Sequence, residues 1–346
     1  MKALVKQCRG ADGVALTQVP EPIPQKNEIK IKVYAIGICG TDIHIMRDEF
    51  DSNPPVTMGH EYSGIVYEVG EDVKDFKPGD RVVSLTTVIS CGQCNYCHAG
   101  LFMLCESRLA IGCGINGAFA EYLVIPADKA FKIPDEVSLE EAALCEPLAC
   151  VVRSVIERAT VKAGDYVYVS GPGTIGQLTM QAAIASGGKV VVGGTSIDGE
   201  RLALASKLGA FETMLVNKED IFIRTKEITN GYGFDVAFEC AGVAQSADTC
   251  IRLLKKTGLY AQVGLYGEKI MFDHDLALKK EITMTNSFTS TRTSWERALR
   301  MLKYGQINMK PLISARLPIE EWKKGFDMVI NKTGYKILLL PDDERQ

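Results

Sequence analysis

The sequence lacks the features of several protein classes. No apolar run reaches the roughly 18 residues that a membrane-spanning helix needs, and there is no internal repeat or low-complexity tract. Acidic residues slightly outnumber basic ones, 43 against 39, so neither nucleic acid nor a membrane surface is an expected partner. The first residues, MKALVKQCRG, carry charges where a secretory signal has an apolar core. We therefore expect a cytoplasmic protein.

What the chain has in excess is cysteine, with 11 among its 346 residues. Disulfides rarely form in a reducing cytoplasm, so clustered cysteines indicate metal binding or redox chemistry there. The hydrophobic share of 46% and charged share of 24% are ordinary for globular proteins. At roughly 100–200 residues per domain, the length predicts two domains.

The pattern of apolar and turn-forming residues changes near residue 150. Before it, extended runs such as 28–40 and 62–70 are separated by glycine and proline, which predicts a mostly β region. After residue 165, apolar runs alternate with helical stretches, which predicts βαβ units and a parallel sheet covered on both faces. The expected strands are 166–171, 189–194, 212–216, 234–242, 259–265 and 281–288, and the expected helices are 174–187, 199–210, 219–229 and 245–256. Two amphipathic helices (295–305, 320–332) and a strand (335–340) close the chain.

A glycine-rich turn follows the first of these strands and opens a helix. Its residues, Gly171-Pro172-Gly173-Thr174-Ile175-Gly176, fit G-x-G-x-x-G. The first glycine permits the tight turn, the second lets a pyrophosphate approach the backbone, and the third packs helix on strand. Such a string alone also fits a structural turn, but between a strand and a helix it predicts a dinucleotide site.

The tip of the next strand bears on the choice between NAD and NADP. NAD sites usually have an acid about 20 residues after the glycine turn, but this strand ends in Gly194, Thr195 and Ser196. These residues leave room for a 2′-phosphate, with Arg201 as its counter-charge. Asp198 could instead curl back to the ribose, so both cofactors stay open, with NADP slightly favoured.

Four cysteines form one tight cluster, Cys91, Cys94, Cys97 and Cys105. Four thiolates so close in sequence can enclose a tetrahedral Zn²⁺ with no open position, which is a structural site. An iron–sulfur cluster is an alternative, but the spacing fits it less well. The string Cys94-x-x-Cys97-His98 also matches the attachment motif of c-type haem. Haem attachment, however, requires an exported protein and would leave Cys91 and Cys105 unexplained.

A second set of possible ligands is dispersed along the chain. Cys39, His60, Glu61 and Glu146 would make an incomplete Zn²⁺ shell with room for substrate, as in catalytic sites. Taken singly, Cys39 fits a buried thiol and His60 a core histidine. Sequence spacing alone does not bring them together.

Three motifs together resemble one family. Gly59-His60-Glu61-x2-Gly64-x5-Gly70 resembles the signature of zinc-containing medium-chain alcohol dehydrogenases, and the cysteine cluster and the glycine turn occur in that family's order. The resemblance spans essentially the whole chain. Within the family, Glu146-Pro147-Leu148 resembles the sorbitol (L-iditol) 2-dehydrogenase branch, whereas the segment 39–44 also resembles threonine dehydrogenase.

The resemblance implies an α/β architecture with two kinds of domain. A mostly-β, GroES-like catalytic domain would span 1–152, with the structural zinc lobe at 88–108. A Rossmann domain with a doubly wound parallel sheet would span 153–289 and bind NAD or NADP. Residues 290–346 would return to the catalytic domain. Each chain would hold two zinc ions, one catalytic and one structural.

The resemblance also implies roles for individual residues. Cys39, His60 and a carboxylate, Glu61 or Glu146, would hold the catalytic zinc. Thr41 would bond the reacting oxygen and pass its proton toward His44. The implied reaction is hydride transfer between a secondary alcohol of a polyol or sugar derivative and NAD(P).

The same resemblance bears on assembly. The segment VGL, with Val263 and Leu265, and the segment KKEITMT resemble strands that line the nicotinamide and build a subunit contact. A homo-oligomer, dimer or tetramer, is therefore expected by analogy.

The sequence departs from the sorbitol enzymes where they hold substrate. Ile45 and Met46 follow His44 in place of an aromatic residue. Ser290 and Thr291 stand where those enzymes carry an Arg-Tyr pair, with Arg292 one step away. Sorbitol itself is thus in doubt. The alternatives are an amino-alcohol dehydrogenase of the threonine type and a non-catalytic, zinc-stapled nucleotide-binding protein.

Overall fold

The chain folds into two compact units. The structure, a computed structural model, describes residues 1–341. Unit 1 contains residues 1–147 and 290–303 and the described chain from 309 onward, and unit 2 contains Leu148–Thr289 and Tyr304–Asn308. The domain boundaries expected at 152 and 289 stay a prediction.

Unit 1 is built around a mixed sheet in which β3 is the central strand. The strand order in the described chain is β10-β6-β5-β3-β18-β17, and β9 also pairs with β3. Ile29, Ile31 and Val33 alternate along β3 and are fully buried, as the pattern at 28–40 predicted. The strands are β1 (Lys2–Lys6), β2 (Val14–Gln18), β3 (Glu28–Gly37), β4 (Val56–Thr57), β5 (Glu61–Val69), β6 (Arg81–Ser84), β7 (Thr87–Ile89), β8 (Leu109–Ala110), β9 (Tyr122–Pro126), β10 (Ala130–Lys132), β17 (Ile313–Pro318) and β18 (Lys336–Leu340).

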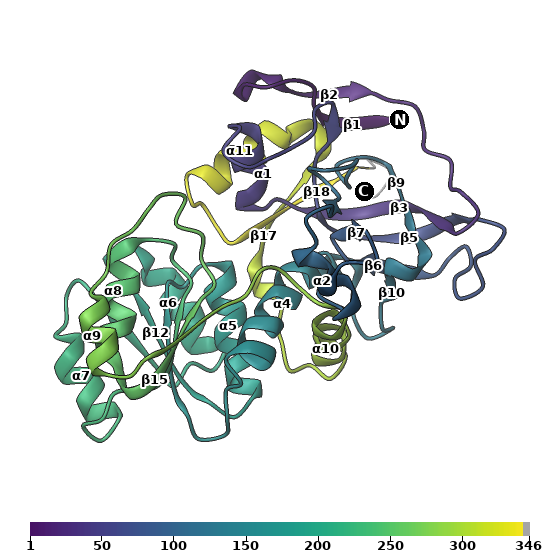
Figure 1. Cartoon of the computed structure of the whole chain (residues 1–346). Helices are drawn as coiled ribbons and strands as arrows, with labels where there is room; N and C mark the ends of the chain where they lie inside the picture. The colour runs from purple at the N-terminus through teal and green to yellow at the C-terminus, as the bar shows by residue number, and fades with distance from the viewer. Residues whose placement is uncertain (342–346) are drawn as a thin grey trace. The chain divides into compact units, whose positions relative to one another are not determined.

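The end of the described chain completes the unit 1 sheet. Strand β18 pairs antiparallel with β3, Leu338 opposite Gly37, and β17 lies parallel to β18. This pairing joins residues almost the whole chain apart, which can be followed in Figure 1. The helices of this unit are α1 (Gly40–Met46), α2 (Asn95–His98), α3 (Leu139–Ala142), α10 (Arg292–Lys303) and α11 (Trp322–Ile330), while α4 (Cys145–Val152) runs across the division.

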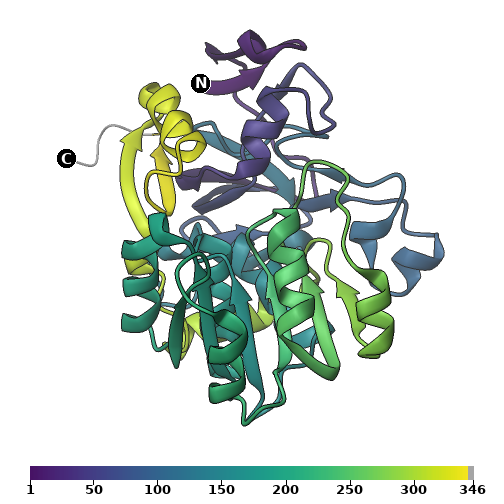
Figure 2. The same cartoon turned by 90° about the vertical axis from the view of Figure 1, so that its left-hand side faces the viewer.

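Unit 2 is a parallel sheet with helices on both faces (Figure 2). The strand order is β13-β12-β11-β14-β15-β16 and every pairing within it is parallel. This is the 3-2-1-4-5-6 order of two mononucleotide-binding halves. The elements are β11 (Tyr166–Ser170), α5 (Thr174–Ala185), β12 (Lys189–Gly194), α6 (Gly199–Lys207), β13 (Glu212–Leu215), α7 (Ile221–Ile228), β14 (Phe234–Glu239), α8 (Ala244–Leu253), β15 (Leu254–Gln262), α9 (His274–Lys279) and β16 (Thr283–Asn286).

Several expected boundaries in unit 2 are wrong. The helix predicted near 245–256 ends at Leu253, and β15 begins at the next residue. The reason is tertiary: Lys280, which follows β15 in the sequence, donates from Nζ to the carbonyls of Ile251, Arg252 and Leu254 and so satisfies the end of α8. The strand expected at 259–265 also ends early, at Gln262 of β15, so residues 263–265 lie in the turn after the strand.

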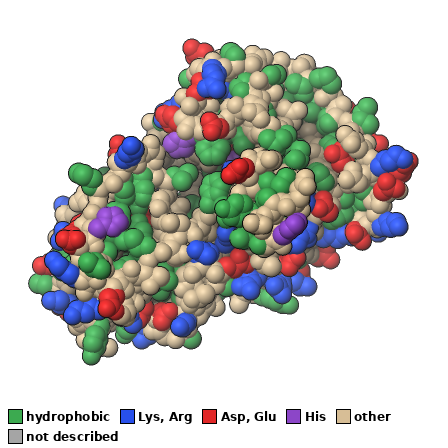
Figure 3. Space-filling model, viewed as in Figure 1, with side chains coloured by type: hydrophobic (Ala, Val, Ile, Leu, Met, Phe, Trp, Pro, Cys, Tyr) green, Lys and Arg blue, Asp and Glu red, His purple; other side chains and the backbone are tan. Residues whose placement is uncertain are grey.

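The visible surface mixes both charge signs. On the face in Figure 3, Lys and Arg side chains are interspersed with Asp and Glu. Among residues 1–341, no helix combines the length and apolar character that crossing a bilayer would require.

Candidate active site and metal centres

Cys39, His60 and Glu61 converge in unit 1. One ligand atom from each lies within 4.8 Å of the other two. The convergence follows from sheet pairing, because Gly37 of β3 is directly opposite Glu61 of β5 and Cys39 follows Gly37 by two residues. Glycine at position 37 leaves room for the carboxylate, since a Cβ there would lie 2.4 Å from Glu61 Oε2. A thiolate, an imidazole and a carboxylate are the donor types that zinc prefers, and three leave one position open.

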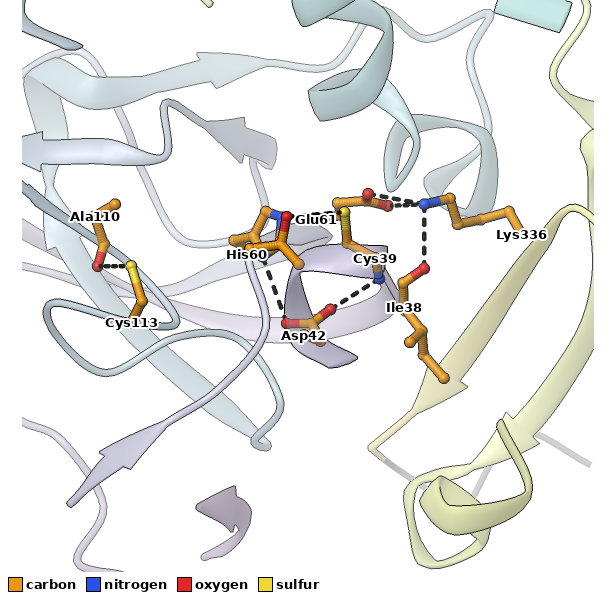
Figure 4. Close-up of polar contacts among 9 residues, drawn as sticks. Ile38, Cys39, Asp42, His60, Glu61, Ala110, Cys113 and Lys336 are labelled. Carbon is orange, nitrogen blue, oxygen red and sulfur yellow. Dashed lines mark hydrogen bonds and ion pairs between the residues drawn. The ribbon is translucent and has the colours of Figure 1, made fainter. Parts of the chain in front are cut away.

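Asp42 holds two members of this group in place. It is fully buried on α1, its Oδ2 accepts the Cys39 backbone N–H at 2.8 Å, and its Oδ1 lies 3.6 Å from His60 Nδ1 (Figure 4). With Nδ1 facing the carboxylate, Nε2 is the nitrogen available to an ion. Burial by itself lowers the pKa of His60, but Asp42 and Cys39 outweigh it and raise that pKa well above its usual value. The site therefore stabilises positive charge.

Sequence reasoning missed Lys336, the first residue of β18. Its Nζ lies 2.8 Å and 2.6 Å from the two Glu61 carboxylate oxygens and 3.2 Å from the Ile38 carbonyl oxygen. Both side chains of the pair are almost fully buried. Burial would lower the pKa of Lys336, but Glu61 and then Cys39 raise it above the usual value. Lys336 neutralises the excess negative charge of this donor set.

Three further predicted site residues lie outside the group of ligand atoms. Thr41 Oγ1 is 3.6 Å from Cys39 Sγ, so its hydroxyl lies beside the group. His44 is exposed on α1, and its Nδ1 is 2.7 Å from Glu49 Oε2. Glu146 is buried at the start of α4, and its charge contributes to the raised pKa of Lys336.

Arg292 is directed elsewhere in unit 1. Its guanidinium donates to the Asp128 carbonyl and lies over the Phe131 ring at 5.0 Å. The Phe131 ring stacks in turn on Trp295 of α10. These contacts anchor the start of α10.

The four-cysteine cluster forms a second group in unit 1. The Sγ atoms of Cys91, Cys94, Cys97 and Cys105 all lie within 4.8 Å of one another, with Cys91 and Cys97 3.9 Å apart. Zinc–sulfur bonds of about 2.3 Å in a tetrahedron separate the sulfurs by roughly 3.8 Å. The donor set thus fits one tetrahedral ion better than a multinuclear cluster.

The local backbone donates hydrogen bonds to two of these thiols. The N–H groups of Gln93 and Cys94 lower the pKa of Cys91 to about 6, whereas burial and the neighbouring thiols raise the pKa of Cys94 to about 11. The backbone N–H of Cys97 also donates to Cys94 Sγ, at 3.5 Å. His98 of the haem-like string is not a member of the group, since all four of its donors are thiols.

The glycine turn of unit 2 has the geometry that its sequence predicts. Gly171 has φ +96°, and a Cβ on Gly176 would lie 1.8 Å from the Gly171 carbonyl oxygen. Gly173 is the N-cap of α5, makes no side-chain cap, and has open space where its Cβ would be. Thr174 and Ile175 form the first turn of the helix. An anion can approach these backbone N–H groups.

At the tip of β12, Asp198 curls back onto the chain. Its Oδ2 accepts the backbone N–H and the hydroxyl of Thr195, at 2.9 Å and 2.8 Å, and its Oδ1 lies 3.7 Å from Arg201. Ser196 is exposed, and both its backbone N–H and its hydroxyl oxygen bond to the Asn217 amide at 3.0 Å. Asn217 is a second residue that the sequence did not single out.

Comparison with known proteins identifies the family. A model of the alcohol dehydrogenase GroES-like domain matches residues 25–135, and a model of the zinc-binding dehydrogenases matches residues 174–304. A sorbitol dehydrogenase of Halalkalibacterium halodurans is 40% identical over 99% of this chain and 100% of its own length. A D-arabitol-phosphate dehydrogenase of Enterococcus avium is 36% identical (99% and 98%), and an L-threonine 3-dehydrogenase of Marinomonas sp. is 34% identical (98% and 99%).

Solved structures agree with this assignment. A zinc-binding dehydrogenase from Sinorhizobium meliloti bound to NADP superposes with a TM-score of 0.89 at 34% identity, covering 98% of this chain and 99% of its own. Galactitol-1-phosphate dehydrogenase from Escherichia coli has a TM-score of 0.89 at 28% identity, covering 99% and 100%. The chain belongs to the zinc-binding, medium-chain alcohol dehydrogenase family. The expected family, fold class and dehydrogenase activity are thereby confirmed.

Proposed function

We propose that this protein is a zinc-dependent dehydrogenase that transfers a hydride between a secondary alcohol of a polyol or sugar derivative and NAD(P). The observation that carries the proposal is the convergence of Cys39, His60 and Glu61 into a donor set with one position open. Relatives named for sorbitol and arabitol phosphate support a polyol substrate. The threonine enzyme at 34% identity supports an amino alcohol as the second candidate.

Each residue of the site has a separate task. A zinc ion held by Cys39, His60 and Glu61 would supply Lewis acidity that lowers the pKa of the substrate hydroxyl. Glu61 is the carboxylate of the shell in this proposal, because its oxygens belong to the convergent group and those of Glu146 do not. Asp42 fixes the His60 ring, and Lys336 balances charge.

The substrate proton leaves through Thr41 and His44 in this proposal. The Thr41 hydroxyl lies beside Cys39, and His44 follows one helical turn later on α1. Glu49 holds His44 Nδ1, which leaves Nε2 to exchange a proton with water.

The test is a panel of sugar alcohols, their phosphates and L-threonine, assayed with both cofactors. Turnover of polyols that is lost on chelation and recovered with Zn²⁺ would support the proposal. A preference for L-threonine would favour the second candidate. Absence of turnover with every alcohol, or full activity after the zinc is removed, would contradict a zinc-dependent dehydrogenase.

We propose further that the cofactor is NADP(H). Asp198 is committed to Thr195 and Arg201, so its carboxylate is a poor acceptor for ribose hydroxyls. The Asn217 amide donates to Ser196 Oγ, which leaves the Ser196 hydrogen free to be donated. A phosphate accepts and cannot donate, so this donor suits a 2′-phosphate. The NADP-bound relative supports the same choice.

Direct titration distinguishes the two cofactors. NADPH should bind more tightly than NADH when nicotinamide fluorescence is followed. Ser196→Asp should reverse that order, because a carboxylate accepts ribose hydroxyls and repels a phosphate. Arg201→Ala should weaken NADPH more than NADH. Tighter binding of NADH to the wild-type protein would overturn this choice.

Assembly and location complete the proposal. Strand β16 ends the sheet of unit 2 and Met284 on it is exposed, which supports a homo-oligomer formed through this edge. We also propose a cytoplasmic location, because a chain with 11 cysteines and two thiolate metal sites suits a reducing compartment. The mass in solution by light scattering tests the first point, and a single-chain mass would contradict it.

A further inference from the structure

The sheet of unit 2 has two equivalent turns at its carboxyl edge. Strands β11 and β14 are parallel neighbours, and each begins one mononucleotide-binding half. The β11–α5 turn contains Gly171 and Gly173 and is open, with no side chain capping α5. The β14–α8 turn (residues 240–243) stands at the matching place in the second half. By this symmetry, both turns present backbone N–H groups to a ligand at the edge.

The second turn is filled from within by Glu239, the last residue of β14. Its side chain is fully buried, and Oε1 accepts the backbone N–H groups of Ala241 and Gly242 at 2.9 Å and 2.8 Å. The carboxylate therefore occupies the N–H donors of its own turn. In the first turn the residues aligned with Ala241 and Gly242 are Pro172, which has no N–H, and Gly173. A carboxylate is a reasonable internal substitute for a phosphate oxygen, because both are anionic acceptors.

Glu239 also holds the turn that follows β15. Its backbone carbonyl accepts the N–H groups of Val263 and Gly264, both at 2.9 Å. The two turns touch closely: a Cβ on Gly242 would lie 2.5 Å from the Leu265 carbonyl oxygen. A Cβ on Gly264 would lie 2.8 Å from Glu239 Oε2. One residue thus fixes the β14–α8 turn and the turn containing Val263 and Leu265.

The remaining carboxylate oxygen is unusual for a buried group. Among residues 1–341, Glu239 Oε2 has no hydrogen-bond partner. Burial, together with the charge of Glu239 and a side-chain hydrogen bond to it, raises the pKa of Tyr266 to about 12. The Tyr266 hydroxyl is 2.6 Å from that of Tyr260. Burying a carboxylate costs folding free energy, and the N–H groups of Ala241 and Gly242 offset part of that cost.

We propose that Glu239 is a positioning residue for the nicotinamide half of the cofactor. Its carboxylate fixes the β14–α8 turn through two backbone N–H groups, and its backbone carbonyl fixes the Val263–Leu265 turn beside it. The pyrophosphate is thereby left to the open β11–α5 turn. The inference rests on the dinucleotide binding proposed above, but it concerns only the nicotinamide half of the cofactor.

Binding of the whole cofactor and of its adenosine half tests this assignment. The probes are NADPH, followed by fluorescence, and 2′,5′-ADP, followed by calorimetry. Glu239→Ala should raise the Kd of NADPH about tenfold, as expected for losing hydrogen bonds to a charged group, and leave the Kd of 2′,5′-ADP unchanged. Glu239→Gln should restore most of the affinity, because its amide oxygen can still accept both N–H groups.

Two controls separate positioning from general destabilisation. Asp220→Ala removes an acid that caps α7 through the N–H groups of Phe222 and Ile223, in the adenosine half. It should lower thermal stability without changing the affinity of NADPH relative to 2′,5′-ADP. Hydrogen exchange should speed up at 241–243 and 263–266 in Glu239→Ala alone. If that variant does not fold, Glu239→Asp, shorter by one methylene, should give a smaller loss confined to NADPH.

Three results would overturn the inference. These are unchanged NADPH affinity in every folded Glu239 variant, an equal loss of NADPH and 2′,5′-ADP, and a glutamine variant as weak as the alanine variant. In each case wild-type binding of NADPH would leave the proposed function standing. If wild-type protein bound neither probe nor NADH, the proposed function would fail together with this inference.

Discussion

At the scale of single residues, the site depends on a buried lysine that shares its charge with a metal ligand. Lys336 Nζ approaches both carboxylate oxygens of Glu61, and neither side chain is exposed enough for water to replace the contact. A buried ion pair that loses one partner leaves an uncompensated charge. Glu61 therefore has two stabilising partners available, Lys336 and a bound cation.

Lys336→Met is expected to destabilise the zinc-free protein more than the zinc-loaded protein. Removing the lysine should lower the free energy of unfolding by about 3–5 kcal/mol when no ion is bound, and by less when zinc compensates the Glu61 charge. Urea unfolding with and without zinc measures the difference. A matched control is Lys324→Met, which removes an exposed pair with Glu321 and should have little effect. If Lys336→Met lowered the free energy of unfolding equally with and without zinc, the idea that Lys336 and zinc both compensate the Glu61 charge would be wrong.

The sequence predicted the ligands of this site better than their supports. Cys39, His60 and Glu61 belong to local motifs whose residue types state their chemistry. Asp42 lies within one of those motifs, but nothing local indicates that its carboxylate faces His60. Lys336 is 275 residues from Glu61. Nothing in the local sequence indicates that a lysine at the start of this strand is buried. Such contacts are set by sheet pairing, which spacing does not reveal.

At the scale of elements, the four-cysteine lobe depends on its metal for stability. Between β7 and β8 the chain has only short helical turns, and few of its side chains are buried. A closed tetrahedral ion replaces the hydrophobic core that such a loop lacks. The lobe should therefore unfold locally when the metal is removed.

Cys97→Ala is expected to destabilise this lobe or to cause aggregation. Losing one of four thiolates leaves three charged sulfurs without their ion. Thermal unfolding with light scattering measures the effect, and Cys8→Ala, an exposed cysteine outside both groups, is the control. If Cys97→Ala kept its zinc and melted like the wild-type protein, the structural assignment would be wrong.

A second element-level contact links α3 to β17 and gives a pH-dependent prediction. Arg316 makes a two-pronged bridge to Glu140, at 2.8 Å and 2.7 Å, and thereby lowers the pKa of Glu140. Because the folded pKa is depressed, the stabilisation is complete above the ordinary carboxyl pKa and disappears as the pH falls through the lowered value. Both side chains are partly exposed, so the contribution is at most about 1 kcal/mol.

Arg316→Met should thus lower the free energy of unfolding at neutral pH, and the difference from wild type should vanish in acid. Urea unfolding at a series of pH values follows the change. A gap that stayed constant down to the lowest pH would mean that packing of the arginine stem, and not its charge, supplies the stability.

Element boundaries show where sequence patterns were insufficient. The alternation in unit 2 predicted each of its strands, since parallel strands are buried on both faces and read as apolar runs. The end of α8 was misplaced because Lys280, from beyond β15, satisfies its last carbonyls. Helical periodicity continues to residue 256, but tertiary contacts convert those residues to strand.

At the scale of the whole molecule, the two units differ in how far sequence determines them. Unit 2 is made of consecutive βαβ steps, so order and handedness follow from general rules. Unit 1 closes its sheet with β18, which pairs with β3 from the opposite end of the chain, and with β17, which pairs with β18. Motif order carried the resemblance to the family, but it contained no information on the Lys336 contact that this closure creates.

The central claim is that each chain has two metal sites of different kinds, one closed by four thiolates and one left open beside Glu61. The zinc content per chain, measured by mass spectrometry with turnover of the best alcohol, tests it most directly. Wild-type protein should carry two zinc ions, and Cys39→Ala should be folded, carry one and be inactive. Cys113→Ala, which removes a nearby thiol outside both groups, should keep both ions. An active Cys39→Ala protein that still holds two zinc ions would contradict the account.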